Sequence, residues 1–198
     1  VEQLLPTSAW GTHYVVPTLA SQSRYDLAFV VASQATKLTY NHGGITGSRG
    51  LQAGDVVEFE VRPSWPLYLS ANVGIQVLLF GTGAIRNEVT YDPYLVLIPD
   101  VAAYCPAYVV KSVPGCEGVA LVVAQTKAIS GLTIDGHAVG AKLTWEAVPG
   151  SEFSYAEVEL GTADMIHTAE ATTNLGLLTF GLAKAIGYAT AADCGRSK

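Results

Sequence analysis

The stretch Phe29-Val30-Val31-Ala32 returns 92 residues later as Leu121-Val122-Val123-Ala124, and the sequence around it returns as well. Residues 4–81 reappear in order, with many substitutions, as residues 97–181. Other matching pieces are Leu5-Pro6 with Ile98-Pro99, Tyr14-Val15-Val16 with Tyr108-Val109-Val110, Leu38-Thr39-Tyr40-Asn41 with Leu132-Thr133-Ile134-Asp135, and Leu79-Phe80-Gly81 with Thr179-Phe180-Gly181. The repeat is longer than the roughly 20–50 residues of a solenoid repeat, so it indicates one small domain that is used twice.

Both copies have the pattern of β-strands. In residues 55–61, Val57, Phe59 and Val61 alternate with Glu58 and Glu60, as expected of a strand with one buried face. Further strand-like runs are residues 13–19, 26–32, 36–40, 67–71 and 75–81 in the first copy, and 108–113, 119–124, 155–160, 165–169 and 175–182 in the second. We predict an all-β fold of two tandem duplicated β-sandwich-like units, residues 1–91 and 92–198. The joint near Asp92-Pro93 is short, so the two units are expected to pack together.

Local signals predict the turns between these strands. Asn41-His42-Gly43-Gly44 and Asp135-Gly136 are hairpin signals, because Asn, Asp and Gly readily adopt positive φ. Residues 108–113 and 119–124 are predicted to form a hairpin. Residues 163–173 and 183–192 have some helical tendency, but their threonines and their lack of an apolar stripe favour short turns.

Composition excludes several classes of function. The net charge is −6 and the 11 basic residues are scattered, which argues against a nucleic-acid partner. The longest apolar runs, residues 77–80 and 94–99, are far shorter than the roughly 20 residues of a membrane-spanning helix, so no membrane insertion is expected. The sequence begins at Val1 with neither an initiator Met nor a signal peptide, and we expect it to be a piece of a longer protein that contains further domains.

Three cysteines, Cys105, Cys116 and Cys194, are candidates for a disulfide, and their odd number leaves one thiol without a partner. Cys105 and Cys116 are close in sequence, which makes them the obvious pair. An intervening strand of about 20 Å would hold them apart, however, whereas a disulfide needs Cα atoms within about 7 Å. The rival pairing is Cys105 with Cys194, which would leave Cys116 free to link outward. A third possibility is three reduced cysteines that pack as small hydrophobic residues.

No constellation of residues predicts catalysis, a metal site or a cofactor. His13, His42, His137 and His167 have no pairwise spacing that would place two metal ligands on one face. The sequence has no Gly-x-Ser-x-Gly motif, and residues 81–83 lack the rest of a dinucleotide fingerprint. We therefore expect a protein that is not an enzyme.

Several phrases of the sequence resemble the amino-terminal module of the IgGFc-binding protein family. Residues 1–17 resemble its opening phrase, residues 92–99 its Asp-Pro phrase, and residues 132–136 its phrase Leu-x-Leu-Asp-Gly. Residues 155–160 match the strand that follows. Residues 181–188 match the closing segment loosely, because residues 185–189 lack its usual Pro-Gly.

The resemblance implies a non-enzymatic module of a secreted mucus glycoprotein that maintains the mucosal gel. The family is linked with binding of the Fc region of IgG, of mucins and of trefoil peptides, and its module precedes further cysteine-rich domains of the same chain. An extracellular location also agrees with the use of cysteine here. The resemblance assigns no residue to the Fc contact.

Three aromatic residues near turns, Trp65, Tyr68 and Tyr40, are speculative binding residues, because aromatic anchors dominate many interfaces. The competing interpretation is that these side chains pack in the core. The alternative function is a receptor module that is specific for a glycan or a protein and uses these exposed aromatics. A hydrolase that uses a pair of strand carboxylates is the third and weakest hypothesis.

Overall fold

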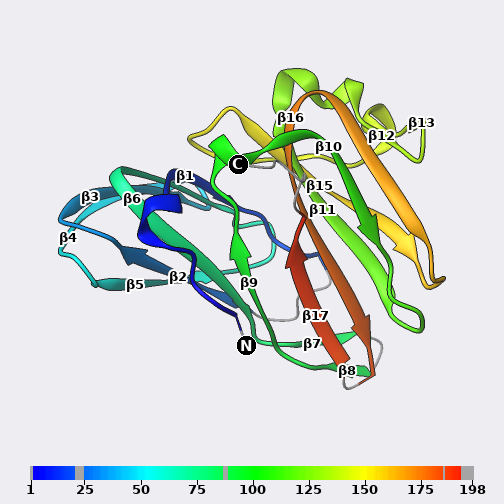
Figure 1. The fold of residues 1–198 in the computed structure, drawn as a ribbon, viewed down its shortest axis with the longest axis horizontal. Coiled ribbons are helices and arrows are strands. Elements are labelled where there is room, and N and C mark those ends of the chain that lie inside the picture. Colours follow the sequence, from blue (N-terminus) through cyan, green and yellow to red (C-terminus); the bar gives the residue numbers. More distant parts are fainter. Residues whose placement is uncertain (1, 21–24, 87–88, 185, 193–198) are drawn as a thin grey trace.

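A computed structural model describes residues 2–20, 25–86, 89–184 and 186–192 (Figure 1). The first copy contains β1 (Gly11–Val16), β2 (Asp26–Ala32), β3 (Thr36–His42), β4 (Ile45–Leu51), β5 (Val56–Val61), β6 (Leu67–Gly81), β7 (Ala84–Arg86), β8 (Val89–Tyr91) and β9 (Tyr94–Ile98). The second contains β10 (Cys105–Lys111), β11 (Glu117–Gln125), β12 (Thr133–Ile134), β13 (His137–Ala138), β14 (Glu146–Ala147), β15 (Phe153–Gly161), β16 (Ile166–Ala183) and β17 (Ile186–Ala191). The short 3₁₀ helices are η1 (Thr7–Ala9), η2 (Val101–Ala103), η3 (Thr126–Gly131) and η4 (Gly140–Lys142).

One long strand organises the first unit. The first half of β6 pairs with β1 on one side and β3 on the other, and β3 pairs with β4. The second half of β6 pairs with β2 and β9, and β2 pairs with β5. The strand therefore belongs to both layers of a sandwich, β1-β6-β3-β4 and β9-β6-β2-β5.

The second unit has the same topology. The first half of β16 pairs with β10 and β12, and β12 pairs with β13. The second half of β16 pairs with β11 and β17, and β11 pairs with β15. The predicted all-β fold of two duplicated sandwich-like units packed together is thus confirmed, and the second unit adds one strand, β14, which pairs with β15.

A buried tyrosine makes the same two hydrogen bonds in each unit. The hydroxyl of Tyr14 donates to the carbonyl of Ile75 (2.6 Å) and accepts from the amide of Gly11 (2.9 Å). The hydroxyl of Tyr108 donates to the carbonyl of Leu175 (2.8 Å) and accepts from the amide of Cys105 (3.0 Å). These bonds cross the point where the register of β1 on β6, and of β10 on β16, shifts by a bulge. Each tyrosine thus satisfies backbone groups that the bulge removes from the ladder.

The second unit uses both faces of β11. Ala120, Val122 and Ala124 point into the core of the second unit itself. Val119, Leu121 and Val123 point the other way, with Leu178 and Phe180 of β16, into a core that they share with the first unit. We call these outward side chains the A face. The equivalent side chains of the first unit are Leu27, Phe29 and Val31 of β2, with Leu78 and Phe80 of β6.

The first unit receives this A face on a different surface. Val15, Tyr68 and Asn41 lie opposite one another in register on β1, β6 and β3, and so share one side of their layer. We call this row the B face. The turn before β15 packs on it, because a Cβ on Gly150 would lie 2.7 Å from Nδ2 of Asn41. The equivalent row of the second unit is Val109, Thr168 and Asp135, in which Asp135 bonds to Thr168 through its backbone amide and its carboxylate.

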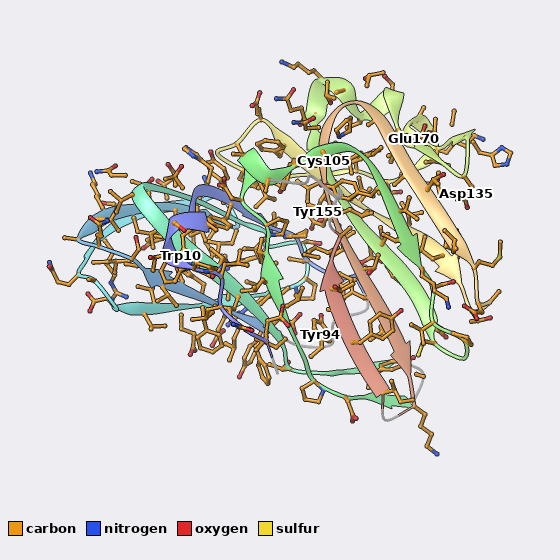
Figure 2. The ribbon with its side chains drawn as sticks, viewed as in Figure 1. Trp10, Tyr94, Cys105, Asp135, Tyr155 and Glu170 are labelled. Atoms are coloured by element: carbon orange, nitrogen blue, oxygen red, sulfur yellow. The ribbon has the colours of Figure 1, made fainter. Side chains whose placement is uncertain are left out.

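Polar and aromatic contacts complete the joint between the units. The hydroxyls of Thr18 and Tyr155 lie 2.7 Å apart, and the carboxylate of Glu157 accepts from the amide of Ala20. The ring of Tyr94, on β9, meets the ring of Phe180 edge to face at 5.3 Å. Figure 2 shows Tyr94 and Tyr155 at this joint, and Figure 1 shows β9 beside β17. The two units therefore share a hydrophobic core.

Some local predictions were wrong. Residues 108–113 and 119–124 do not form a hairpin, because β10 pairs with β16 while β11 pairs with β15 and β16. Residues 170–173 and 186–191 belong to strands rather than turns, since β16 pairs with the distant β10 and β11 and β17 pairs with the adjacent end of β16. The division of folding units at residues 91 and 92 stays a prediction, although β9 pairs with β6 and so lies in the first sheet.

The obvious disulfide, Cys105 with Cys116, is also wrong. Cys116 is a buried free thiol. β10 is an extended strand that places Cys105 at its start and carries the chain away from it before the turn that holds Cys116. Cys194, the partner in the rival pairing, lies outside the described residues, so that pairing stays a prediction.

Replacing either bridging tyrosine by phenylalanine, Tyr14→Phe or Tyr108→Phe, should lower the free energy of unfolding by about 1–3 kcal/mol, because a buried amide and a buried carbonyl lose their partner. Denaturant unfolding of both variants measures this loss. Tyr25→Phe, at an exposed side chain, is the matched control and should change little. Unchanged stability in both variants would show that the two hydrogen bonds do not hold the bulges.

Candidate functional site

Trp65 is the most exposed of the three predicted binding residues, and it lies on the turn between β5 and β6. The amide of Trp65 donates to the carbonyl of Arg62 (2.9 Å), and Ser64 between them adopts a left-handed backbone with φ of 59°. The amide of Gly43, in the β3–β4 hairpin, donates to the carbonyl of Pro66 (3.1 Å). These bonds tie the turn to the neighbouring hairpin.

The indole of Trp65 packs against Gly43. A Cβ on Gly43 would fall 2.7 Å from Cδ2 of Trp65, so the ring packs directly on the backbone of the hairpin, which only glycine permits. The side chain of Asn41 accepts from the amide of Gly44 (3.0 Å) and closes the hairpin. Trp65 nevertheless remains 41 % exposed. The result is an exposed aromatic side chain with little freedom to move.

Trp65 ends a row of four aromatic side chains, which we call the aromatic row: Tyr40, Phe59, His42 and Trp65. The ring centroids are 5.0 Å apart for Tyr40 and Phe59, 6.1 Å for Phe59 and His42, and 5.9 Å for His42 and Trp65, each pair edge to face. Such pairs add to the stability that apolar burial provides. The guanidinium of Arg62 lies 6.0 Å from the Trp65 ring centroid and bonds to the carboxylate of Glu60 (2.7 Å).

His42 lies between the rings of Phe59 and Trp65 and is half-buried. Burial lowers its pKa, and the nearby Arg62 acts in the same direction, whereas a hydrogen bond with the backbone of Glu60 and the charge of Glu60 oppose the shift. Its Nε2 atom is buried and has no hydrogen-bond partner. The neutral imidazole is therefore the form that the aromatic row accommodates.

The third predicted binding residue, Tyr68, does not join this row. It belongs to the B face, where burial and the nearby Glu152 of the second unit raise its pKa. The structure thus brings Tyr40 and Trp65 together and places Tyr68 at the joint between the units. Sequence reasoning missed Phe59, His42 and Arg62 as members of the site, although the alternation in β5 and the hairpin signal around His42 mark where the first two lie.

A histidine–carboxylate pair occupies the second unit. Nδ1 of His167 lies 2.8 Å from the carboxylate of Asp135, which also accepts from the amide of Thr168 (2.8 Å). The pKa of Asp135 is lowered, first by the hydrogen bond with His167 and then by the Thr168 amide. The other ring nitrogen of His167 is buried without a partner. In the first unit, Asn41 and Leu67 stand at the equivalent positions, so we interpret the pair as a local support of the Asp135-Gly136 turn.

Among the described residues, neither His42 nor His167 forms a metal centre with its neighbours. In the part of the chain that the structure describes, no three His, Cys, Asp or Glu side chains converge as metal ligands do. No helix in that part is long and apolar enough to cross a membrane.

Comparison with known proteins decides the family. A family model described as "IgGFc binding protein" matches residues 1–181. The chain belongs to this family. No solved structure matches it.

Acid should destabilise the aromatic row of this IgGFc-binding family member. A histidine with a lowered folded-state pKa contributes stability that is complete above the unfolded-state pKa of about 6.5 and is lost as the pH falls below it. Denaturant midpoints measured from pH 7.5 to 5 should therefore fall, and the fall should be smaller in His42→Asn. His137→Asn, at the exposed turn of the second unit, is the matched control. An equal pH dependence in the His42 and His137 variants would contradict the assignment to His42.

Proposed function

We propose that this chain is an extracellular, non-enzymatic module that binds the Fc region of IgG. The match to the IgGFc-binding family over residues 1–181 is the observation that carries the proposal. Within the family resemblance, the module would belong to a mucus glycoprotein that maintains the mucosal gel, in contact with mucins and trefoil peptides and beside further domains of its own chain.

The surface that we propose for Fc is the end of the first unit that carries Trp65. Binding hot spots are commonly Trp, Tyr and Arg side chains held rigid before the partner arrives. Trp65 and Arg62 meet this description, since Gly43 and His42 hold the indole. Ile45 in the adjacent hairpin adds an exposed apolar side chain.

A glycan partner at the same surface is the alternative. Sugar recognition by tryptophan requires a free ring face for stacking. Here Gly43 packs on the indole and the Arg62 guanidinium lies over the ring, so both compete with a sugar for that position. This crowding favours a protein partner.

Trp65→Ala should weaken binding to immobilised Fc about tenfold or more, as expected of a hot-spot tryptophan, with little change in Tm. Surface plasmon resonance with Fc, and with Fab as the negative partner, measures this. Ile166→Ala is the matched control, because this equally apolar exposed side chain lies on the other unit.

Three results would redirect the proposal. Failure of the unaltered protein to bind Fc would refute Fc as the partner. Full binding by Trp65→Ala would move the contact away from this surface. Loss of binding after enzymatic removal of the Fc glycan would favour the glycan alternative.

An extracellular module can carry a disulfide, and the repeat supports Cys105 with Cys194. Cys105 corresponds to Gly11, through the shared offset of their neighbours Tyr108 and Tyr14. Cys194 corresponds to Asp100, through the pairing of Tyr188 with Gly181 and of Tyr94 with Gly81. Gly11 and Asp100 touch, since a Cβ on Gly11 would lie 2.3 Å from Cβ of Asp100. The two cysteines thus occupy repeat positions that are in contact in the first unit.

A peptide map of protein secreted by eukaryotic cells, with free thiols blocked in denaturant before digestion, should yield one linked pair, Cys105 with Cys194, and a blocked Cys116. Cys105→Ser should then cost about 2–5 kcal/mol of stability, whereas Cys116→Ser should leave the link in place. Three blocked cysteines, or a link that includes Cys116, would contradict this pairing.

A further inference from the structure

The two units pack through different surfaces, and this leaves one unused copy of each surface. The A face of the second unit covers the B face of the first. Head-to-tail contacts of this kind are heterologous, and they can continue from copy to copy without closing. The first unit therefore keeps a spare A face, and the second unit keeps a spare B face.

Burial confirms that the used surfaces are covered and the spare ones are not. On the used B face, Val15 is 1 % exposed, whereas its equivalent on the spare B face, Val109, is 66 % exposed. On the used A face, Val119, Leu121, Val123, Leu178 and Phe180 are all buried. Their equivalents on the spare A face, Leu27, Phe29, Val31, Leu78 and Phe80, are all partly exposed, and none belongs to the buried part of either core.

The spare A face retains the apolar character of the used one. All five of its central positions hold a side chain as large as the buried equivalent or larger, with Leu27 for Val119 and Phe29 for Leu121 among them. Val56 of β5 lies opposite Val31 and is 59 % exposed. Its equivalent in the second unit is Tyr155, which reaches Thr18 across the joint. A sheet face of this composition has the character of an interface.

The spare B face offers a matching surface. Ile166, which is 67 % exposed, lies opposite Lys111 on the strand beside Val109. Lys111 forms an ion pair with the exposed Asp164 at 2.9 Å on this face. Glu58 and Glu60 line the margin of the spare A face, since they pair with Phe29 and Leu27. Each spare surface thus combines an apolar centre with a margin that carries charged side chains.

We propose that a second copy of this chain docks its B face, around Val109 and Ile166, onto the A face around Phe29 and Val56. The contact repeats the joint between the two units of one chain. The exposed apolar side chains of the proposed Fc surface, Trp65 and Ile45, lie outside both faces, and the ion pair of Arg62 with Glu60 links that surface to the margin of the A face. Each chain has one spare A face and one spare B face. The copies therefore add in an open row rather than closing as a symmetric dimer.

Sedimentation velocity of the unaltered chain tests this at concentrations up to about 100 µM, a range that detects contacts with Kd near that value. The weight-average mass should rise steadily with concentration, past that of a dimer. Val56→Asp and Val109→Asp change one exposed side chain on each surface, and each should keep its Tm and remain a monomer in isolation. Ile45→Asp, an equally exposed apolar site elsewhere, should associate as the unaltered chain does.

An equimolar mixture of the two monomeric variants provides the decisive measurement. Val56→Asp retains an intact B face and Val109→Asp retains an intact A face, so the mixture should form a one-to-one dimer that grows no further. A chain that stays monomeric throughout the concentration range would overturn the proposal. Association of either single variant with itself, or the absence of a dimer in the mixture of variants of an associating chain, would equally overturn it.

Discussion

In each unit, the backbone groups of one long bent strand must all find hydrogen-bond partners, and this requirement determines how the other strands are arranged. β6 and β16 run through both layers of their sandwiches, so each half needs a different pair of neighbours for its backbone groups. At the bend, where β1 and β10 lose register, a tyrosine hydroxyl supplies the missing partners. Because an equivalent tyrosine is present in both copies, both units have the same bend and the same two layers on either side of it.

The proposed binding surface also depends on backbone hydrogen bonds. The β3–β4 hairpin bonds to the residue before β6 through Gly43, and the indole of Trp65 packs where a side chain on Gly43 would otherwise lie. The guanidinium of Arg62 lies over the indole ring, and the ring of His42 meets it edge to face. The exposed tryptophan is therefore held by two elements that the long strand brings together.

Duplication has not made the two copies equivalent. Asn41 and Leu67 of the first unit correspond to Asp135 and His167 of the second, which bond to each other. Asp26 accepts from Tyr94, whereas its equivalent is Gly118 and the buried hydroxyl of Tyr188 has no side-chain partner among the described residues. The largest difference is positional, since one copy buries its A face and the other buries its B face. Head-to-tail packing makes such a difference unavoidable, because the first and last units of any row lack one neighbour.

The sequence by itself determined the all-β class, the duplication and several turns. Alternation in residues 55–61 and the Asp135-Gly136 turn are local properties, and repeated phrases such as Tyr14-Val15-Val16 are visible without any structure. The family also follows from phrases that can be read along the chain, and the match over residues 1–181 confirms it.

Only the tertiary structure decided which strands meet and which side chains form a surface. β10 pairs with β16 rather than with β11, and Cys116 remains a free thiol, because the partners of a strand lie far away in sequence. Tyr40, Phe59 and Trp65 come from three different elements, and their spacing in sequence says nothing of their contact. Val15 and Val109 occupy the same position in two similar sequences, yet one is buried and the other exposed. Burial between units depends on the presence of a neighbour, which no property of the residue itself encodes.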